Sequence, residues 1–240
     1  MTVRPLADVV AALDGAFAAA PRPTAIDACS CCIRAEEIAV LLNTPRRRLQ
    51  ADDLVGYGVH VMNTVGGAED LRYFAPRLLE LSLTPGGMTW PDLELIFIKL
   101  GQANWWSWPE AMILQELMDA LWIDVLTHDP SWVGTGELLC SLGSAQPSIA
   151  HRLHDWSALR TAAAIANLHE FLTTETEIKD RRLVARNAYW DTASTTYTEL
   201  STWLNDGPAL AAVEAAISAH TSEAVQVQLT AIRDRLLPTR

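Results

Sequence analysis

Apolar residues recur at intervals of three and four positions along almost the whole chain, whereas alternating apolar and polar residues are scarce. Intervals of three and four are typical of an amphipathic α-helix. Proline or glycine separates the periodic segments, and serine, threonine or aspartate often begins them. The pattern predicts an all-α fold of about ten helices in stacked antiparallel pairs, arranged as a compact bundle or a short HEAT-like array.

The predicted helices are joined by short loops. In the N-terminal half they cover residues 6–19, 35–42, 52–63, 69–81, 91–102 and 109–127. In the C-terminal half they cover 137–142, 148–171, 175–204, 208–219 and 222–237, with breaks expected near 155 and 187. A stretch richer in glycine, serine and proline spans 134–147. We therefore expect one helical domain over residues 1–240, with a seam near 134–147.

Two similar tetrapeptides predict two helix starts. They are Thr89-Trp90-Pro91-Asp92 and Ser107-Trp108-Pro109-Glu110. Each has a hydroxyl suited to an N-cap, a proline suited to the first turn and a carboxylate three positions after the hydroxyl. The second pattern predicts a capping box, in which Ser107 and Glu110 each bond the other's free backbone amide.

Charge narrows the classes of partner. Acidic residues outnumber basic ones by 29 to 18, which gives a net charge of −11. Direct nucleic-acid binding and attachment to an anionic membrane both need a cationic face, so we expect neither. No apolar run approaches the roughly 18 residues of a membrane span. Three of the four cysteines lie within four positions, a poor disulfide framework, which predicts a reduced, cytoplasmic setting.

An acidic window without a single cation extends between Lys99 and Arg152. It holds six carboxylates and five of the nine tryptophans. A negative surface speeds association with a basic partner, and exposed tryptophan is a frequent hot-spot residue. The alternative is that the tryptophans hold helices together and the carboxylates form a solvated face. The predicted partner-binding residues are Trp105, Trp106, Glu110, Glu116, Asp119, Asp124 and Trp132.

These features favour a non-enzymatic interaction protein. The chain lacks the common nucleotide-binding, nucleophile-elbow and zinc-protease motifs, so no catalytic residue is assigned. The preferred hypothesis is an immunity or antitoxin-type protein that masks a basic effector protein. A structural subunit of a larger assembly is an alternative.

A second hypothesis, from a different class, is a metal-binding protein. Cys29, Cys31 and Cys32 supply soft thiolate ligands, and Cys29 and Cys32 have CxxC spacing. Zinc, the candidate cofactor, takes four such ligands, so folding would have to add His60 or Cys140. The alternative is that these thiols pack as small apolar side chains in a loop that leads into a helix.

A basic run, Arg46-Arg47-Arg48, follows the predicted second helix. Three arginines can bind phosphate. They can also cap the carbonyls at the end of the preceding helix or pair with Asp52 and Asp53, and this structural role is the expected one.

Several short motifs lie between about residues 21 and 125. They are Pro21-Arg22-Pro23, Ile26, Cys29-x-x-Cys32, Leu41-Leu42-x-Thr44-Pro45, Asp53-Leu54, Tyr57, Phe74-x-Pro76-Arg77-x-Leu79 and Trp105-x-x-Trp108-Pro109. In these motifs the segment resembles a family of uncharacterised bacterial all-helical proteins. The resemblance implies a helical fold and brings no activity, cofactor or site residues with it.

Overall fold

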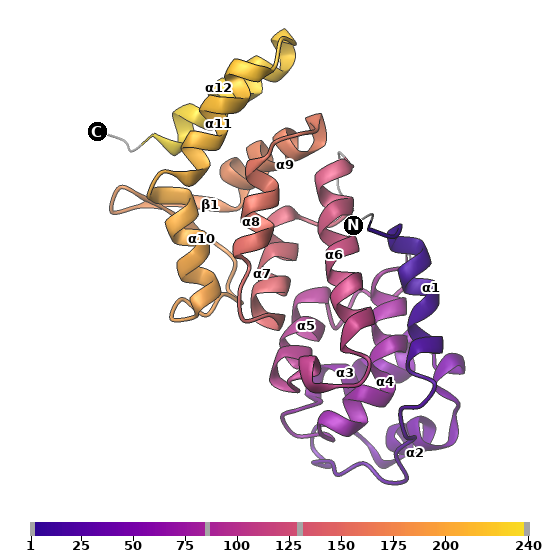
Figure 1. The fold of residues 1–240 in the computed structure, drawn as a ribbon. Coiled ribbons are helices and arrows are strands. Elements are labelled where there is room, and N and C mark those ends of the chain that lie inside the picture. The colour runs from indigo at the N-terminus through magenta and orange to yellow at the C-terminus, as the bar shows by residue number, and fades with distance from the viewer. Residues whose placement is uncertain (1–2, 85–86, 129–131, 238–240) are drawn as a thin grey trace. The chain divides into compact units, whose positions relative to one another are not determined.

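The computed structural model describes residues 3–84, 87–128 and 132–237 (Figure 1). It is 64% helical, with twelve α-helices and one two-stranded sheet in the described ranges, which confirms the predicted helical class. The chain divides into two compact units, Met1–Ala120 and Leu121–Arg240. The division falls within one helix, α6 (Ala111–Thr127), whereas the predicted seam at 134–147 contains a buried helix of the second unit. No helix among the described residues is both long and apolar enough to cross a bilayer.

The first unit is built around helix α4 (Ala68–Ser82), which contacts α1, α3, α5 and η1. Its inward face carries Leu71, Phe74 and Leu78, all at most 1% exposed. Tyr57 of α3 meets Phe74 edge to face, with ring centroids 4.9 Å apart. The other elements are α1 (Leu6–Ala16), α2 (Ala35–Asn43), η1 (Arg46–Arg48), α3 (Ala51–His60), α5 (Leu93–Gln102), η2 (Trp105–Ser107) and the start of α6 (Ala111–Thr127).

Arg46 and Arg47 of the basic run have a structural role, as expected, but with other partners than the predicted ones. Arg46 is buried, its Nε lies 2.6 Å from Asp14 Oδ1, and its Nη1 donates to the carbonyl of Phe17 at 2.9 Å. Arg47 also pairs with Asp14. Arginine thus satisfies the free carbonyl at the C-terminal end of α1 rather than α2, because η1 packs beside that end.

Both predicted helix starts are wrong in detail. Helix α5 begins at Leu93, and its N-cap is Asp92, whose carboxylate accepts from the amide of Leu95 at 2.9 Å. Ser107 lies in η2 and donates to the carbonyl of Asn104 at 2.8 Å. Its expected capping partner, Glu110, instead binds an arginine of α4, so no capping box forms and α6 begins at Ala111.

The second unit packs its helices around a cluster of aromatic rings. Trp156 stacks on Trp203 at 5.4 Å and meets Trp122 edge to face at 5.5 Å. Helix α9 contacts α7 and α12, and α10 contacts α8 and α11. The elements are α7 (Thr135–Ala145), α8 (Ala150–Ser157), α9 (Ala162–Thr174), β1 (Thr176–Lys179), β2 (Arg182–Ala185), α10 (Thr195–Asn205), α11 (Pro208–Ala219) and α12 (Glu223–Leu236).

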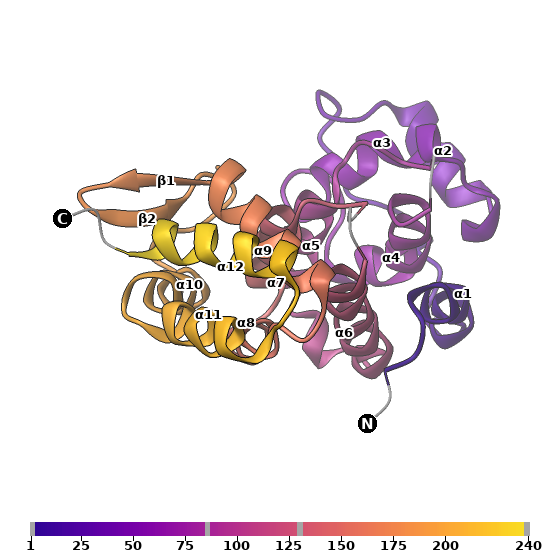
Figure 2. The ribbon, with the colours of Figure 1, turned by 90° about the horizontal axis from the view of Figure 1, so that it is seen from above.

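The helix predicted over 175–204 is wrong in its first half, which forms the antiparallel hairpin β1–β2. Ile178 pairs with Leu183 across the strands, and the turn residues Asp180 and Arg181 have φ of 50° and 63°. Positive φ at both turn positions suits the right-handed twist of a two-residue hairpin. The hairpin projects from the helices of its unit in both views (Figures 1 and 2).

Candidate metal centre

The three neighbouring cysteines lie in the loop between α1 and α2. The amide of Cys29 donates to the carbonyl of Thr64 at 2.9 Å, which ties the loop to the segment after α3. The amide of Cys32 returns to the carbonyl of Cys29 at 2.9 Å, and that of Ile33 reaches it at 3.3 Å. This tight turn folds the chain back on itself, so side chains two and three positions apart share one side of the loop.

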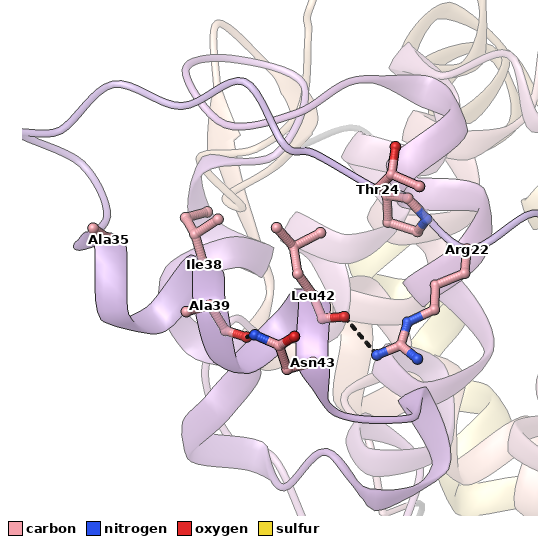
Figure 3. Close-up of a pocket in the computed structure, with 8 residues that line it drawn as sticks. Arg22, Thr24, Ala35, Ile38, Ala39, Leu42 and Asn43 are labelled. Carbon is pink, nitrogen blue, oxygen red and sulfur yellow. Dashed lines mark hydrogen bonds between the residues drawn. The ribbon is translucent and has the colours of Figure 1, made fainter.

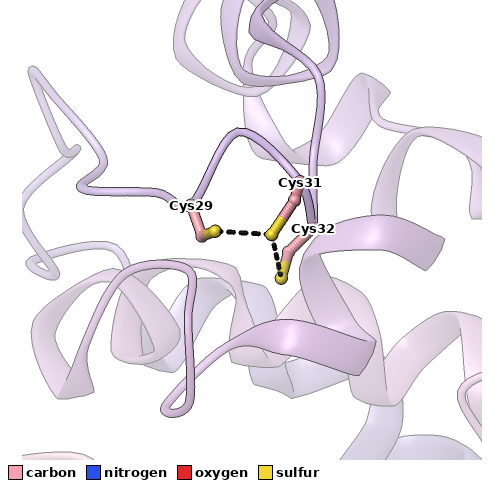
Figure 4. A group of neighbouring side chains, drawn as sticks. All are labelled: Cys29, Cys31 and Cys32. Carbon is pink, nitrogen blue, oxygen red and sulfur yellow. Dashed lines mark hydrogen bonds between the residues drawn. The ribbon is translucent and has the colours of Figure 1, made fainter.

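The sulfur atoms converge (Figure 4). The Sγ atoms of Cys29 and Cys31 are 2.7 Å apart, those of Cys31 and Cys32 are 3.8 Å apart, and all three lie within 4.8 Å of one another. Around a tetrahedral zinc with bonds of about 2.3 Å, sulfur ligands lie about 3.8 Å apart. One pair already has that spacing and another needs to open by about 1 Å, so the cluster could hold a metal ion.

Hydrogen bonding makes the thiols inequivalent. The Cys31 thiol and the backbone amides of Cys31 and Cys32 stabilise a thiolate at Cys29 and lower its pKa. Hydrogen bonds to the thiols of Cys29 and Cys32, and the negative charge of these two groups when ionised, raise the pKa of Cys31 to about 11. Cys29 and Cys31 are exposed, so reagents and ions in solvent can reach them. A thiolate with amide donors and open access is the reactive and metal-binding form of cysteine.

The structure adds no fourth protein ligand. Among the described residues, no ligand atom of another histidine, cysteine, aspartate or glutamate joins this group. His60, one predicted fourth ligand, is the last residue of α3. Cys140, the other, is buried in α7 of the second unit. Any metal held here would therefore keep a coordination position for a ligand from outside the cluster.

Two of the predicted partner-binding residues of the first unit are buried. Trp105 is 3% exposed, and its ring meets that of Trp106 edge to face. Glu110 is 6% exposed, and both of its carboxylate oxygens bind Arg72. Neither residue can form part of a surface. Trp106 is 49% exposed and remains available to a partner.

The other two predicted partner-binding carboxylates of the first unit, Glu116 and Asp119, form hydrogen bonds with other side chains. Both oxygens of Glu116 accept from Arg4, at 2.5 and 2.6 Å, which lowers the pKa of Glu116. Asp119 accepts from the side-chain amide of Gln115 at 2.9 Å. Arg4, a cation far away in sequence, thus balances a charge of the acidic window.

In the second unit, Asp124 and Trp132 are direct partners. The indole Nε1 of Trp132 donates to Asp124 Oδ2 at 3.0 Å, and His128 Nδ1 lies 3.1 Å from Asp124 Oδ1. Trp132 remains 51% exposed. The sequence placed these residues in one window, and folding joins them in a small polar contact.

An open pocket of about 650 Å³ lies between residues 22–24 and helix α2 (Figure 3). Arg22 borders it and donates to the carbonyl of Leu42 at 2.6 Å, at the end of α2. Arg22 is the single ionisable side chain among its lining residues, so the pocket contains neither an acid–base pair nor metal ligands. The lining residues are Arg22, Pro23, Thr24, Ala35, Ile38, Ala39, Leu42 and Asn43.

Comparison with family models, with curated proteins and with solved structures finds no match for this chain. Function is therefore inferred from the chemistry of the residues described above. Of these, the converging thiols of Cys29, Cys31 and Cys32 form the group with the most specific chemistry.

Proposed function

We propose that this protein binds zinc through the thiolates of Cys29, Cys31 and Cys32. The observation that carries the proposal is the convergence of three sulfur atoms within 4.8 Å at an exposed turn. Zinc favours thiolate ligands and imposes no rigid geometry of its own, so a three-sulfur cluster suits it.

The expected coordination is three protein sulfurs and one exchangeable ligand. A closed structural zinc site uses four protein ligands, whereas a site with three keeps a position for water or an incoming group. Bound there, zinc would supply a Lewis acid and an anchor for a soft or anionic donor. The protein's own contribution is the turn at Cys29–Cys32, which brings the ligands together, and the amides of Cys31 and Cys32, which favour a thiolate at Cys29.

The proposal is tested by zinc content and affinity, measured on reduced protein with a chromophoric chelator as competitor. We expect one zinc per chain in the wild type. Cys29→Ser, Cys31→Ser and Cys32→Ser should each weaken binding, and Cys140→Ala, which removes a buried thiol elsewhere, should retain it. Absence of zinc binding, or binding that survives all three serine substitutions, would overturn the proposal.

A second candidate function, recognition of a basic partner protein, is favoured by one observation. Trp106 and Met112, 49% and 86% exposed, lie in η2 and at the start of α6. Large apolar side chains at the surface of an acidic protein are suited to anchor a partner that charge attracts. In its specific form, this second proposal is that the chain is an immunity or antitoxin-type protein that masks a basic effector. Trp106 would anchor the effector, because Trp105 and Glu110 are buried.

Two exposed tryptophans of the first unit provide a matched test. With a basic partner protein in hand, Trp106→Ala should weaken binding by about tenfold or more, as loss of a hot-spot residue does. Trp90→Ala, at a residue 45% exposed and outside the acidic window, should leave the affinity unchanged. Equal losses in both variants would remove the reason to assign the anchor to Trp106.

A further inference from the structure

A pocket in the second unit is bordered by arginines, although the chain as a whole is acidic. It has a volume of about 210 Å³ and lies between the hairpin β1–β2, the end of α10 and the end of α12. No carboxylate lies among its lining residues, which are Ile178, Arg181, Arg182, Leu183, Asn205, Arg235, Leu236 and Leu237.

The hairpin concentrates positive charge. Four of the chain's 18 basic residues lie between positions 179 and 186, in a protein of net charge −11. Arg181 occupies the turn and has no acceptor for its guanidinium among the described residues. Arg182 pairs with Asp206 at 3.3 Å, and both of these side chains are 51% exposed. An exposed pair of this kind is weak, so the guanidinium can turn to a stronger anion.

The third arginine is held in place by the protein backbone. Arg235 donates from Nε to the carbonyl of Leu172 at 3.2 Å and from Nη2 to the carbonyl of Thr176 at 3.3 Å. Neither acceptor is charged, so its positive charge is not balanced by these contacts. Its Nη1 has no acceptor among the described residues and is left for a ligand. A fixed guanidinium binds an anion at a lower entropic cost than a mobile one.

Two further lining residues, Asn205 and Leu183, are held in place by hydrogen bonds to each other. The side-chain amide of Asn205 donates to the carbonyl of Leu183 at 3.1 Å and accepts from its amide at 2.8 Å. These two hydrogen bonds between the Asn205 side chain and the backbone of Leu183 join β2 to the end of α10. The hairpin therefore presents its arginines from a supported position rather than from a free loop.

Apolar side chains complete the pocket. Ile178 and Leu237 are 41% and 43% exposed, which is unusual for large aliphatic side chains that have helices close by. A ligand with a short apolar part would cover them, and removal of this apolar surface from water would favour binding. The volume is below the range of roughly 300–1,000 Å³ that drug-sized molecules occupy, so the ligand must be small.

We infer that this pocket binds a small organic anion, with a phosphate or carboxylate group facing Arg181, Arg182 and Arg235 and a short apolar chain against Ile178 and Leu237. Arginine recognises both anionic groups through paired N–H donors. The inference is independent of the thiol cluster, which lies in the other unit.

The test is calorimetric titration of the full chain with hexyl phosphate and with hexanoate. Saturable binding of either one is expected, and the stronger of the two identifies the anionic group. Arg181→Gln and Arg182→Gln should each weaken binding by about tenfold or more, the loss expected for a charged hydrogen bond. Arg186→Gln is the matched control, because Arg186 is an exposed cation after β2 that does not line the pocket.

Three results would overturn the inference. The first is no saturable binding of either alkyl anion. The second is equal binding of hexylammonium, which would show that charge is not recognised. The third is an equal loss in Arg186→Gln, which would show attraction by net charge without a defined site. Circular dichroism of each variant checks that the helical fold is retained.

Discussion

Arg72 binds Glu110 through two parallel hydrogen bonds inside the first unit, from Nε to Oε2 at 2.8 Å and from Nη2 to Oε1 at 2.9 Å. The side chains are 14% and 4% exposed. The pair joins α4 to the segment that leads into α6, and it converts a residue of the acidic window into part of the interior. Acidic residues close in sequence therefore have separate roles in the fold.

Breaking this buried pair should be costly. Glu110→Ala removes both short bonds and leaves Arg72 with the longer contact to the exposed Glu69, at 3.5 Å, so we expect a loss of about 1–3 kcal/mol in the free energy of unfolding, measured by urea denaturation. Arg4→Ala breaks the exposed pair with Glu116 and should cost much less, because solvent screens that pair. Similar small losses in both variants would show that the Arg72–Glu110 pair does not support the fold.

Two glycines should respond to alanine with opposite signs. A Cβ on Gly143 of α7 would lie 2.6 Å from Cζ3 of Trp190, a ring that is itself buried. Gly143→Ala should therefore lower the free energy of unfolding by about 1–3 kcal/mol. A Cβ on Gly15 of α1 would meet no atom within 4 Å, so Gly15→Ala should raise it by about 0.5–1 kcal/mol through helix propensity. Thermal melts of the two variants test both predicted signs. A Gly143→Ala variant more stable than wild type would contradict the packing of Trp190 against this glycine.

Asp14 should make stability depend on pH in the acid range. Burial alone would raise the pKa of Asp14, but hydrogen bonds from Arg46 and Arg47 outweigh it and leave the pKa below its usual value. The stabilisation is complete above the unfolded pKa of about 3.9 and is lost as pH falls through the folded pKa. Asp14→Asn should thus be less stable than wild type at pH 7, and the difference should vanish in strong acid. A difference that is constant with pH would contradict this pairing.

The cysteines should differ in reactivity. Because hydrogen bonds lower the pKa of Cys29 and raise that of Cys31 to about 11, alkylation by iodoacetamide at pH 7 to 8 should modify Cys29 first. Buried Cys140 should react last. Mass spectrometry of peptides at successive times gives the order, and faster labelling of Cys31 than of Cys29 would contradict the assigned donor and acceptor roles.

Helical periodicity predicts most of this fold, because amphipathic spacing is a local signal that survives without knowledge of the partner helix. The hairpin escapes it. Residues 175–186 are rich in glutamate, lysine and arginine, which favour helices, and the turn at Asp180 and Arg181 contains no glycine to mark it. Thr176, Ile178 and Val184 are β-branched residues whose spacing, in hindsight, is the signal of strands. Because the hairpin was not predicted, the arginine-bordered pocket beside it was not predicted either.

The convergence of the candidate metal ligands is predictable for a different reason. Cys29, Cys31 and Cys32 are so close in sequence that a single turn brings them together, whereas a fourth ligand would depend on contacts between distant segments. Burial of Glu110 was not predictable, because it depends on Arg72 of α4, which is 38 positions earlier in the sequence. Charge counted along a window therefore says little about charge on a surface.

X-ray absorption at the zinc edge, on protein loaded with one equivalent of zinc, tests the central claim most directly. The three-thiolate proposal predicts three sulfur neighbours at about 2.3 Å and one lighter oxygen or nitrogen neighbour at about 2.0–2.2 Å. One sulfur neighbour should be lost in Cys29→Ser and none in Cys140→Ala. A first shell without sulfur, or one of four sulfurs, would contradict a three-thiolate site with an exchangeable position.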